Sequence, residues 1–194
     1  AAGKENVAAE AGMWQYLDWL DKLGLLDNHA LRSAGDVAAI EGQRGVLEWL
    51  RGAREGPARE AVASWGVHWF VSCARAGQPE VLRWLLTEGF VTRKALAPLR
   101  HGITQTAVFA GNLQNLEALY ELGLYSFGAE FAVEAAARNR LWLLEWLYLK
   151  GCPWDVETIN GARSTEIALW AMLHGCPWTE ATLGSRARAA RWRA

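Results

Sequence analysis

Few side chains in this sequence have the chemistry of a metal ligand or a nucleophile, and their spacing does not bring them together. Zinc sites place a second Cys or His two to four residues from the first. Cys152 has no such neighbour, and Cys176 has only His174, two residues before it. The remaining histidines are scattered, and no His-Glu-x-x-His pattern occurs. We therefore expect no metal and no cofactor.

Motifs for covalent or phosphate chemistry are also absent from the sequence. It contains no Gly-x-Ser-x-Gly turn, no phosphate-binding loop and no dinucleotide fingerprint. Glu48, Glu117 and Glu145 recur at one slot of a repeat that is described below. This recurrence is typical of solvated or helix-capping carboxylates rather than of an acid–base pair. The chain is expected to have no enzymatic activity.

One long connection between repeats has a basic character. The sequence from Gly89 to Leu116 contains no acidic residue. Its basic side chains are Arg93, Lys94, Arg100 and His101. A basic edge suits a partner protein with an acidic or mixed surface, although the same residues also fit an edge that is merely solvated.

The C-terminal residues form a second basic segment. Its candidate binding residues are Arg186, Arg188, Arg191, Trp192 and Arg193. A basic arm with an aromatic residue could bind RNA, an acidic protein or anionic lipid. Residues 179–194 also fit the polar cap of a repeat array or a truncated further repeat.

Tryptophan is unusually abundant, with 12 residues in the chain. Seven occupy repeated slots or turns and are predicted to pack in the core: Trp19, Trp49, Trp84, Trp146, Trp154, Trp170 and Trp178. The other five would be interface anchors wherever they are exposed, since Trp is enriched at binding hot spots. We single out Trp65 and Trp69, which lie in the second long connection between Arg54 and Gly77.

An internal repeat positions all of these residues. Each repeat has an anchor residue, a Leu-x-Trp-Leu-like core and a closing glycine. The anchors are Gly12, Gly42, Gly77, Gly111, Asn139 and Arg163. The closing glycine lies 12 residues after the anchor in five of the six repeats, whereas successive anchors are 30, 35, 34, 28 and 24 residues apart. The spacing within a repeat is therefore fixed, and the connections vary.

The pattern within each repeat predicts two helices. Alanine-rich runs precede the anchor, and Ala is the best helix former. A Gly or Asn anchor suits the left-handed conformation that ends a helix. Apolar residues after the anchor, such as Val81, Leu82 and Leu85, then fall on one face of a second helix. We predict an all-α chain whose residues 1–194 form a single solenoid domain of about six helix-turn-helix repeats. The repeats lie near residues 7–26, 36–56, 71–90, 105–124, 133–154 and 156–178.

The fifth repeat carries a family resemblance. Its core Leu143-Leu144-Glu145-Trp146-Leu147 and its turn Gly151-Cys152-Pro153-Trp154-Asp155 resemble the repeats of divergent ankyrin-repeat proteins of protists, algae and large viruses. The resemblance extends over about residues 7 to 180, although the Thr-Pro-Leu-His signature of standard ankyrin repeats is absent. It implies an ankyrin-like α-solenoid that binds another protein, with neither catalysis nor a cofactor.

Composition narrows the class of protein further. The 194 residues are 52% hydrophobic and carry a net charge of −1, which is a globular composition with no overall attraction to nucleic acid or lipid. No run approaches the roughly 18 apolar residues of a membrane span. The few cysteines favour a reducing, intracellular compartment. We expect a non-catalytic protein-interaction module, such as a scaffold or an accessory subunit of a larger assembly. Two alternatives stay open: an RNA-associated protein that uses the basic segments, and an adaptor that recruits a substrate to an enzyme.

Overall fold

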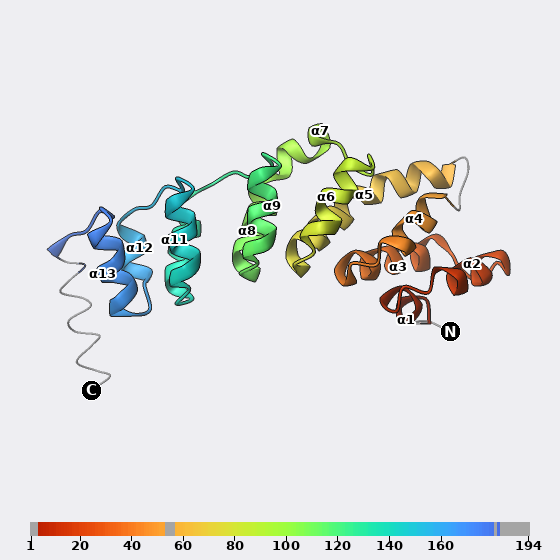
Figure 1. The fold of residues 1–194 in the computed structure, drawn as a ribbon, viewed down its shortest axis with the longest axis horizontal. Coiled ribbons are helices and arrows are strands. Elements are labelled where there is room, and N and C mark those ends of the chain that lie inside the picture. Colours follow the sequence, from red (N-terminus) through yellow and green to blue (C-terminus); the bar gives the residue numbers. More distant parts are fainter. Residues whose placement is uncertain (1–3, 53–56, 181, 183–194) are drawn as a thin grey trace. The chain divides into compact units, whose positions relative to one another are not determined.

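The chain is helical throughout the part that its structure describes. The computed structural model describes residues 4–52, 57–180 and 182, with the backbone alone for residues 57–64. In these residues the regular structure consists of helices α1 to α13 and one 3-10 turn, η1, and contains no strand (Figure 1). The prediction of an all-α chain is confirmed.

Each repeat contributes two helices. The first helices are α1 (Lys4–Glu10), α3 (Asn28–Glu41), α5 (Pro57–Ala76), α8 (Arg100–Ala110), α10 (Ala129–Ala137) and α12 (Val156–Gly161). The second helices are α2 (Trp14–Lys22), α4 (Arg44–Gly52), α6 (Pro79–Thr87), α9 (Leu113–Glu121), α11 (Leu141–Leu149) and α13 (Thr165–Leu173). Every second helix has nine residues and begins two residues after its anchor. The basic connection adds α7 (Arg93–Leu96) and η1 (Ala97–Leu99).

The fixed glycine spacing is explained by backbone conformation. Among the described residues, positive φ occurs at nine glycines and at Asn139, and all ten are anchors or closing residues. The anchor Gly42, for example, has a φ of 75° and ends α3. Glycine adopts this left-handed conformation without the steric penalty that a Cβ atom brings. The sixth anchor, Arg163, is the exception, because α12 ends in extended backbone at Ala162.

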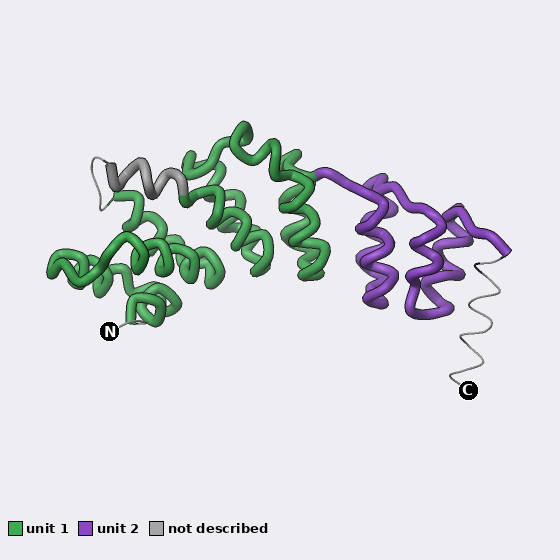
Figure 2. Tube along the Cα trace, turned by 180° about the vertical axis from the view of Figure 1, so that it is seen from behind, with its two compact units in different colours: residues 1–125 green, residues 126–194 purple. Residues whose placement is uncertain are grey.

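The chain divides into two compact units, residues 1–125 and residues 126–194 (Figure 2). In unit 1, α3 packs between α1 and α5, and α5 also contacts α8. In unit 2, α10 contacts α12. The alanines before the anchors are buried in these contacts, which lets neighbouring backbones approach closely: Ala8, Ala9, Ala38, Ala39, Ala74, Ala107, Ala135 and Ala136. That residues 1–194 form one repeat domain stays a prediction.

Side-chain amides tie each repeat of unit 1 to the one before it. The residue after the anchor donates a hydrogen bond to the carbonyl group two residues before the preceding anchor. Gln43 Nε2 donates to Glu10 O at 2.9 Å, Gln78 Nε2 to Ile40 O at 2.9 Å, and Asn112 Nδ2 to Arg75 O at 2.7 Å. Each bond satisfies a carbonyl of the last helical turn, which has no partner within its own helix.

The same amides occupy the space beside the preceding anchor. A Cβ atom added to Gly42 would lie 2.7 Å from Oε1 of Gln78, and one added to Gly12 would lie 2.5 Å from Oε1 of Gln43. Gly12 and Gly42 are therefore glycines for two reasons, the positive φ and the close approach of the next repeat.

The tryptophan slot of the repeat is only partly a core position. Trp146 is buried, whereas Trp49, Trp84 and Trp170 are half-buried, as is the turn residue Trp154. The slot faces the preceding repeat, as the 3.1 Å hydrogen bond from Trp49 Nε1 to Asp18 Oδ1 shows.

The core prediction is wrong for Trp19, which is 55% exposed, and for Trp178, which is also exposed. Trp19 belongs to the first repeat, and the described residues contain no earlier second helix that could cover its ring. Trp178 follows α13, the last second helix that the structure describes.

Alanine substitutions at two glycines separate the roles of the anchors. Gly42 and Gly89 have similar φ values of 75° and 73°, but no atom lies within 4 Å of a Cβ at Gly89. We expect Gly89→Ala to lower the unfolding free energy by about 1 kcal/mol, the cost of left-handed backbone. Gly42→Ala should cost roughly 1–2 kcal/mol more, because the Gln78 amide must move and lose its bond to Ile40. Urea denaturation of both variants measures the difference, and equal losses would contradict the account.

Candidate functional site

The predicted basic edge lies on α7, η1 and the start of α8, and one of its side chains has a structural role. The Arg93 guanidinium donates a hydrogen bond to the carbonyl of Leu122, where α9 ends. Lys94 and His101 are exposed, whereas Arg100 is half-buried, and its Nε atom is buried without a hydrogen bond in the described structure. The four residues thus lie on consecutive elements, and Lys94 is an exposed cation.

The expectation that Trp69 binds a partner is wrong. Its side chain is fully buried, with 0% exposure, and its ring lies 6.2 Å from the ring of Phe90. A Cβ atom at Gly35 would lie 2.5 Å from the indole, so the ring fills the space that this glycine of α3 leaves open. Trp65, one turn earlier on α5, is half-buried, with its ring 6.1 Å from that of Trp69.

An acid–base pair lies beside the buried Trp69. His68 Nε2 on α5 is 3.4 Å from Asp36 Oδ1 on α3. Burial raises the pKa of Asp36 above its usual value near 3.8, and the positive charges of His68 and Arg32 only partly oppose this. The pair joins two neighbouring first helices.

The three cysteines are free and buried, so the repeated turn cysteines form no disulfide. Cys152 Sγ donates to Gly128 O at 3.5 Å, and Cys176 Sγ donates to Asp155 O at 3.2 Å. Gly128 and Asp155 are the N-cap residues of α10 and α12. Each thiol therefore fastens the end of a second helix to the start of the first helix in the same repeat.

Three slots of each second helix lie on the side opposite its buried residues. They come 3, 6 and 10 residues after the anchor and form one helical stripe, which we call the outer face. In unit 1 the outer face carries only glycine and polar residues: Gln15, Asp18, Lys22, Gly45, Glu48, Gly52, Glu80, Arg83, Thr87, Gln114, Glu117 and Glu121. Several of its charges are paired. Lys22 lies 2.6 Å from Asp18, and Arg83 lies 3.0 Å from Glu80 and 2.8 Å from Glu121.

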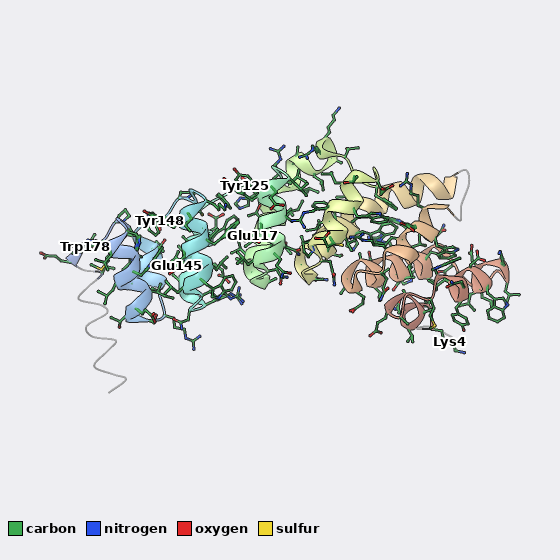
Figure 3. All side chains as sticks on the ribbon, viewed as in Figure 1. Lys4, Glu117, Tyr125, Glu145, Tyr148 and Trp178 are labelled. Carbon is green, nitrogen blue, oxygen red and sulfur yellow. The ribbon has the colours of Figure 1, made fainter. Side chains whose placement is uncertain are left out.

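The outer face of unit 2 has a different chemistry. It comprises Trp142, Glu145 and Leu149 on α11 and Glu166, Leu169 and Leu173 on α13. Leu149 and Leu173 are 77% and 84% exposed, Leu169 is 53% exposed and Trp142 is 45% exposed. Figure 3 labels Glu145 on α11 and, in the same slot of α9, Glu117. Four of the six slots in unit 2 thus expose a large apolar side chain, against none in unit 1.

An aromatic cluster holds α11 and α13 together behind this face. The Tyr148 ring stacks on Trp154 at 4.8 Å and meets the edge of Trp170 at 5.7 Å. His174 stacks on Trp170 at 4.1 Å, and its Nδ1 lies 2.8 Å from the Trp170 carbonyl oxygen. Such ring pairs contribute energy beyond the area they bury. The cluster fixes the two helices that present the exposed leucines.

The carboxylates of the unit 2 outer face are not neutralised by neighbours. Glu145 and Glu166 form no ion pair within the described residues, in contrast to Asp18 and Glu121 in unit 1. Acidic residues outnumber Lys and Arg by seven to four in residues 126–182. The face therefore combines apolar side chains with unpaired negative charge.

The C-terminal candidates Arg186, Arg188, Arg191, Trp192 and Arg193 lie outside the described residues. Within the described part, no group of three or more His, Cys, Asp or Glu is placed to hold a metal. No helix there has the length and hydropathy of a membrane span. Comparisons of the chain with protein families, with curated proteins and with solved structures found no match.

The exposed leucines are not among the residues predicted from the sequence, because that prediction rests on the slots that all repeats share. The leucines can be recognised from the slots whose residue type differs between the repeats of unit 1 and unit 2. The slot ten residues after the anchor holds Lys22, Thr87 and Glu121 in unit 1 but Leu149 and Leu173 in unit 2. Comparing the repeats slot by slot would have found this substitution.

The Asp36–His68 pair predicts a pH dependence of stability. Because the folded-state pKa of Asp36 is raised, the folded chain binds a proton that the unfolded chain has released above about 3.8. The unfolding free energy should therefore fall as the pH rises from about 3.8 through the raised pKa of Asp36. Asp36→Asn should flatten this fall, and Glu41→Gln, at an exposed site on the same helix, should not. Urea denaturation of the wild type and both variants at pH values from about 4 to about 7 tests this. Parallel plots of unfolding free energy against pH for the three proteins would refute it.

The cysteines predict a second measurable property. Burial raises the pKa of Cys73 and Cys152 to about 12 and that of Cys176 to about 11. Since the thiolate is the nucleophile, the native thiols should react with a disulfide reagent at pH about 8 far more slowly than the same thiols in urea. A native rate close to the unfolded rate for any of the three would show that its thiol is not protected.

Proposed function

We propose that this chain is an ankyrin-like α-solenoid without catalytic activity that binds another protein, with the outer face of unit 2 as its docking surface. The proposal makes it an interaction module, in the manner of a scaffold or an accessory subunit. One observation supports this proposal. Slots that are polar or glycine in every repeat of unit 1 expose Trp142, Leu149, Leu169 and Leu173 in unit 2.

Exposed apolar side chains of this kind support a binding role because they gain nothing from folding. A buried leucine stabilises a protein by roughly 1.5–3 kcal/mol relative to an exposed one, and Leu149 and Leu173 forgo most of that in the free chain. A partner that covers these two leucines gains this burial free energy on binding. Contiguous exposed apolar patches accordingly mark interaction sites on soluble proteins.

The first repeat also exposes apolar residues, among them Met13, Trp14 and Trp19. Their slots serve contacts between repeats elsewhere in the chain: Trp49 occupies the slot of Trp19, and Gln43 that of Met13. Within the described residues no repeat precedes Met13 and Trp19, so no earlier helix pair covers these two side chains there. In unit 1 the outer face joins neighbouring repeats through polar contacts, Trp49 Nε1 with Asp18 and Arg83 with Glu121. The leucines in the same slots of unit 2 cannot form such contacts and are exposed.

Substitution of the exposed leucines tests the proposal. Leu149→Ser/Leu173→Ser should weaken binding of the native partner at least ten-fold, because each covered leucine contributes more than about 1 kcal/mol to the binding free energy. The unfolding free energy should change by less than about 0.5 kcal/mol, because both side chains are exposed. The measurement is affinity purification from the source cells, with and without nuclease, followed by mass spectrometry and by binding assays on the recovered partner.

The matched control is Lys22→Ser/Thr87→Ser, which changes the same slot in unit 1 and should retain every partner. Retention of all partners by the leucine variant would overturn the assignment of the outer face. Loss of all partners after nuclease treatment would instead favour the RNA-associated alternative and the basic segments. Recovery of an enzyme together with its substrate would favour the adaptor alternative.

A further inference from the structure

The partner's chemistry can be inferred from the same face, and this step rests on the proposed function. We infer that the outer face of unit 2 receives a basic amphipathic α-helix of the partner protein. The apolar side of that helix covers Trp142, Leu149, Leu169 and Leu173, and its lysines or arginines lie beside Glu145 and Glu166. Three observations lead to this assignment: the kind of surface, the spacing of its apolar residues and its charge.

The surface is made of two helices and offers no strand edge. Recognition by strand addition needs an exposed sheet edge, and the described residues contain no strand. A partner helix needs apolar contacts that recur at helical spacing, and the outer face supplies them. Leu169 and Leu173 are four residues apart on α13, and Trp142 and Leu149 are seven apart on α11. In the inferred complex, the partner helix lies across α11 and α13 and contacts both pairs.

The negative charge of the outer face of unit 2 indicates that the partner surface is positively charged. Glu145 and Glu166 lie among the apolar residues and form no ion pair within the described residues. The ion pair between Arg138 and Glu134 joins two residues that are not in the outer-face slots. Lysine or arginine on the partner supplies the missing charges, and complementary charge favours correct partners and excludes acidic ones.

The same two carboxylates argue against other classes of ligand. The phosphates of RNA and the headgroups of anionic membranes are negative, so both are repelled where Glu145 and Glu166 lie. Binding of those ligands depends on cations, and the outer face of unit 2 has none. A protein helix is the class that suits both its apolar and its acidic residues.

One competing occupant belongs to the chain itself. Residues 183–194 contain Leu183, Trp192 and four arginines, a composition that also complements the face. The test therefore includes a variant in which Arg186, Arg188, Arg191 and Arg193 are all replaced by Gln.

Binding of two designed peptides to the full chain tests the inference. Both probes are labelled helices of about four turns, roughly 14 residues, with leucines at i, i+3, i+4 and i+7. One carries Lys at the other positions and the second carries Glu. Fluorescence anisotropy should show that the Lys peptide binds at least ten-fold more tightly. Glu145→Gln/Glu166→Gln should weaken it by roughly three- to ten-fold, the combined effect of two exposed ion pairs. Leu169→Ser/Leu173→Ser should weaken it by at least ten-fold.

The control variant Glu48→Gln/Glu117→Gln removes two carboxylates from the outer face of unit 1 and should leave the Lys-peptide affinity within two-fold of the wild type. Equal weakening by both charge variants, or equal binding of the two peptides, would overturn the inference. A ten-fold gain in affinity on replacing the four C-terminal arginines would show that residues 183–194 cover the face, which also overturns it. The proposed function is tested separately. It is contradicted if the Leu149→Ser/Leu173→Ser variant still binds the native partners.

Discussion

The residue that ends each first helix sets the constraint on which the rest of unit 1 depends. At Gly42 the backbone turns into the left-handed region, and the Gln78 amide of the next repeat lies where a side chain would be. That amide donates to Ile40 O, in the last turn of the same helix. The turn conformation and the contact between neighbouring repeats are therefore one structural feature. This is why the anchor and the residue after it keep their character while the connections vary in length.

The outer face is free of that constraint. Buried alanines and side-chain amides hold neighbouring repeats together, and the outer face of unit 1 adds polar contacts between repeats. In unit 1 they hold charged residues that pair with one another, as Arg83 does with Glu80 and Glu121. In unit 2 the same slots hold exposed leucines and two carboxylates without ion pairs in the described residues. The proposed docking surface consists of these exposed leucines and carboxylates.

Sequence reasoning predicted the helices well because their ends are encoded by single residues. Each anchor of unit 1 ends its first helix at positive φ, and each second helix begins two residues later. The prediction was wrong for Trp69 because it lies in a long connection of the repeat pattern, whereas in space it fills the gap left by Gly35. It was wrong for Trp19 because a repeat slot faces the preceding repeat, and the first repeat has none before it in the described residues. The leucines were missed because no single repeat distinguishes them; they differ only from the same slots in unit 1.

Site-specific photocrosslinking in the source cells tests the central claim most directly. A photoreactive amino acid placed at Leu173 should capture one protein through its basic helix, because this side chain is 84% exposed and lies on the proposed docking surface. The same amino acid at Thr87, in the matching slot of α6, should capture none. No product at either position, or the same products at both, would contradict the claim that the outer face of unit 2 binds the partner.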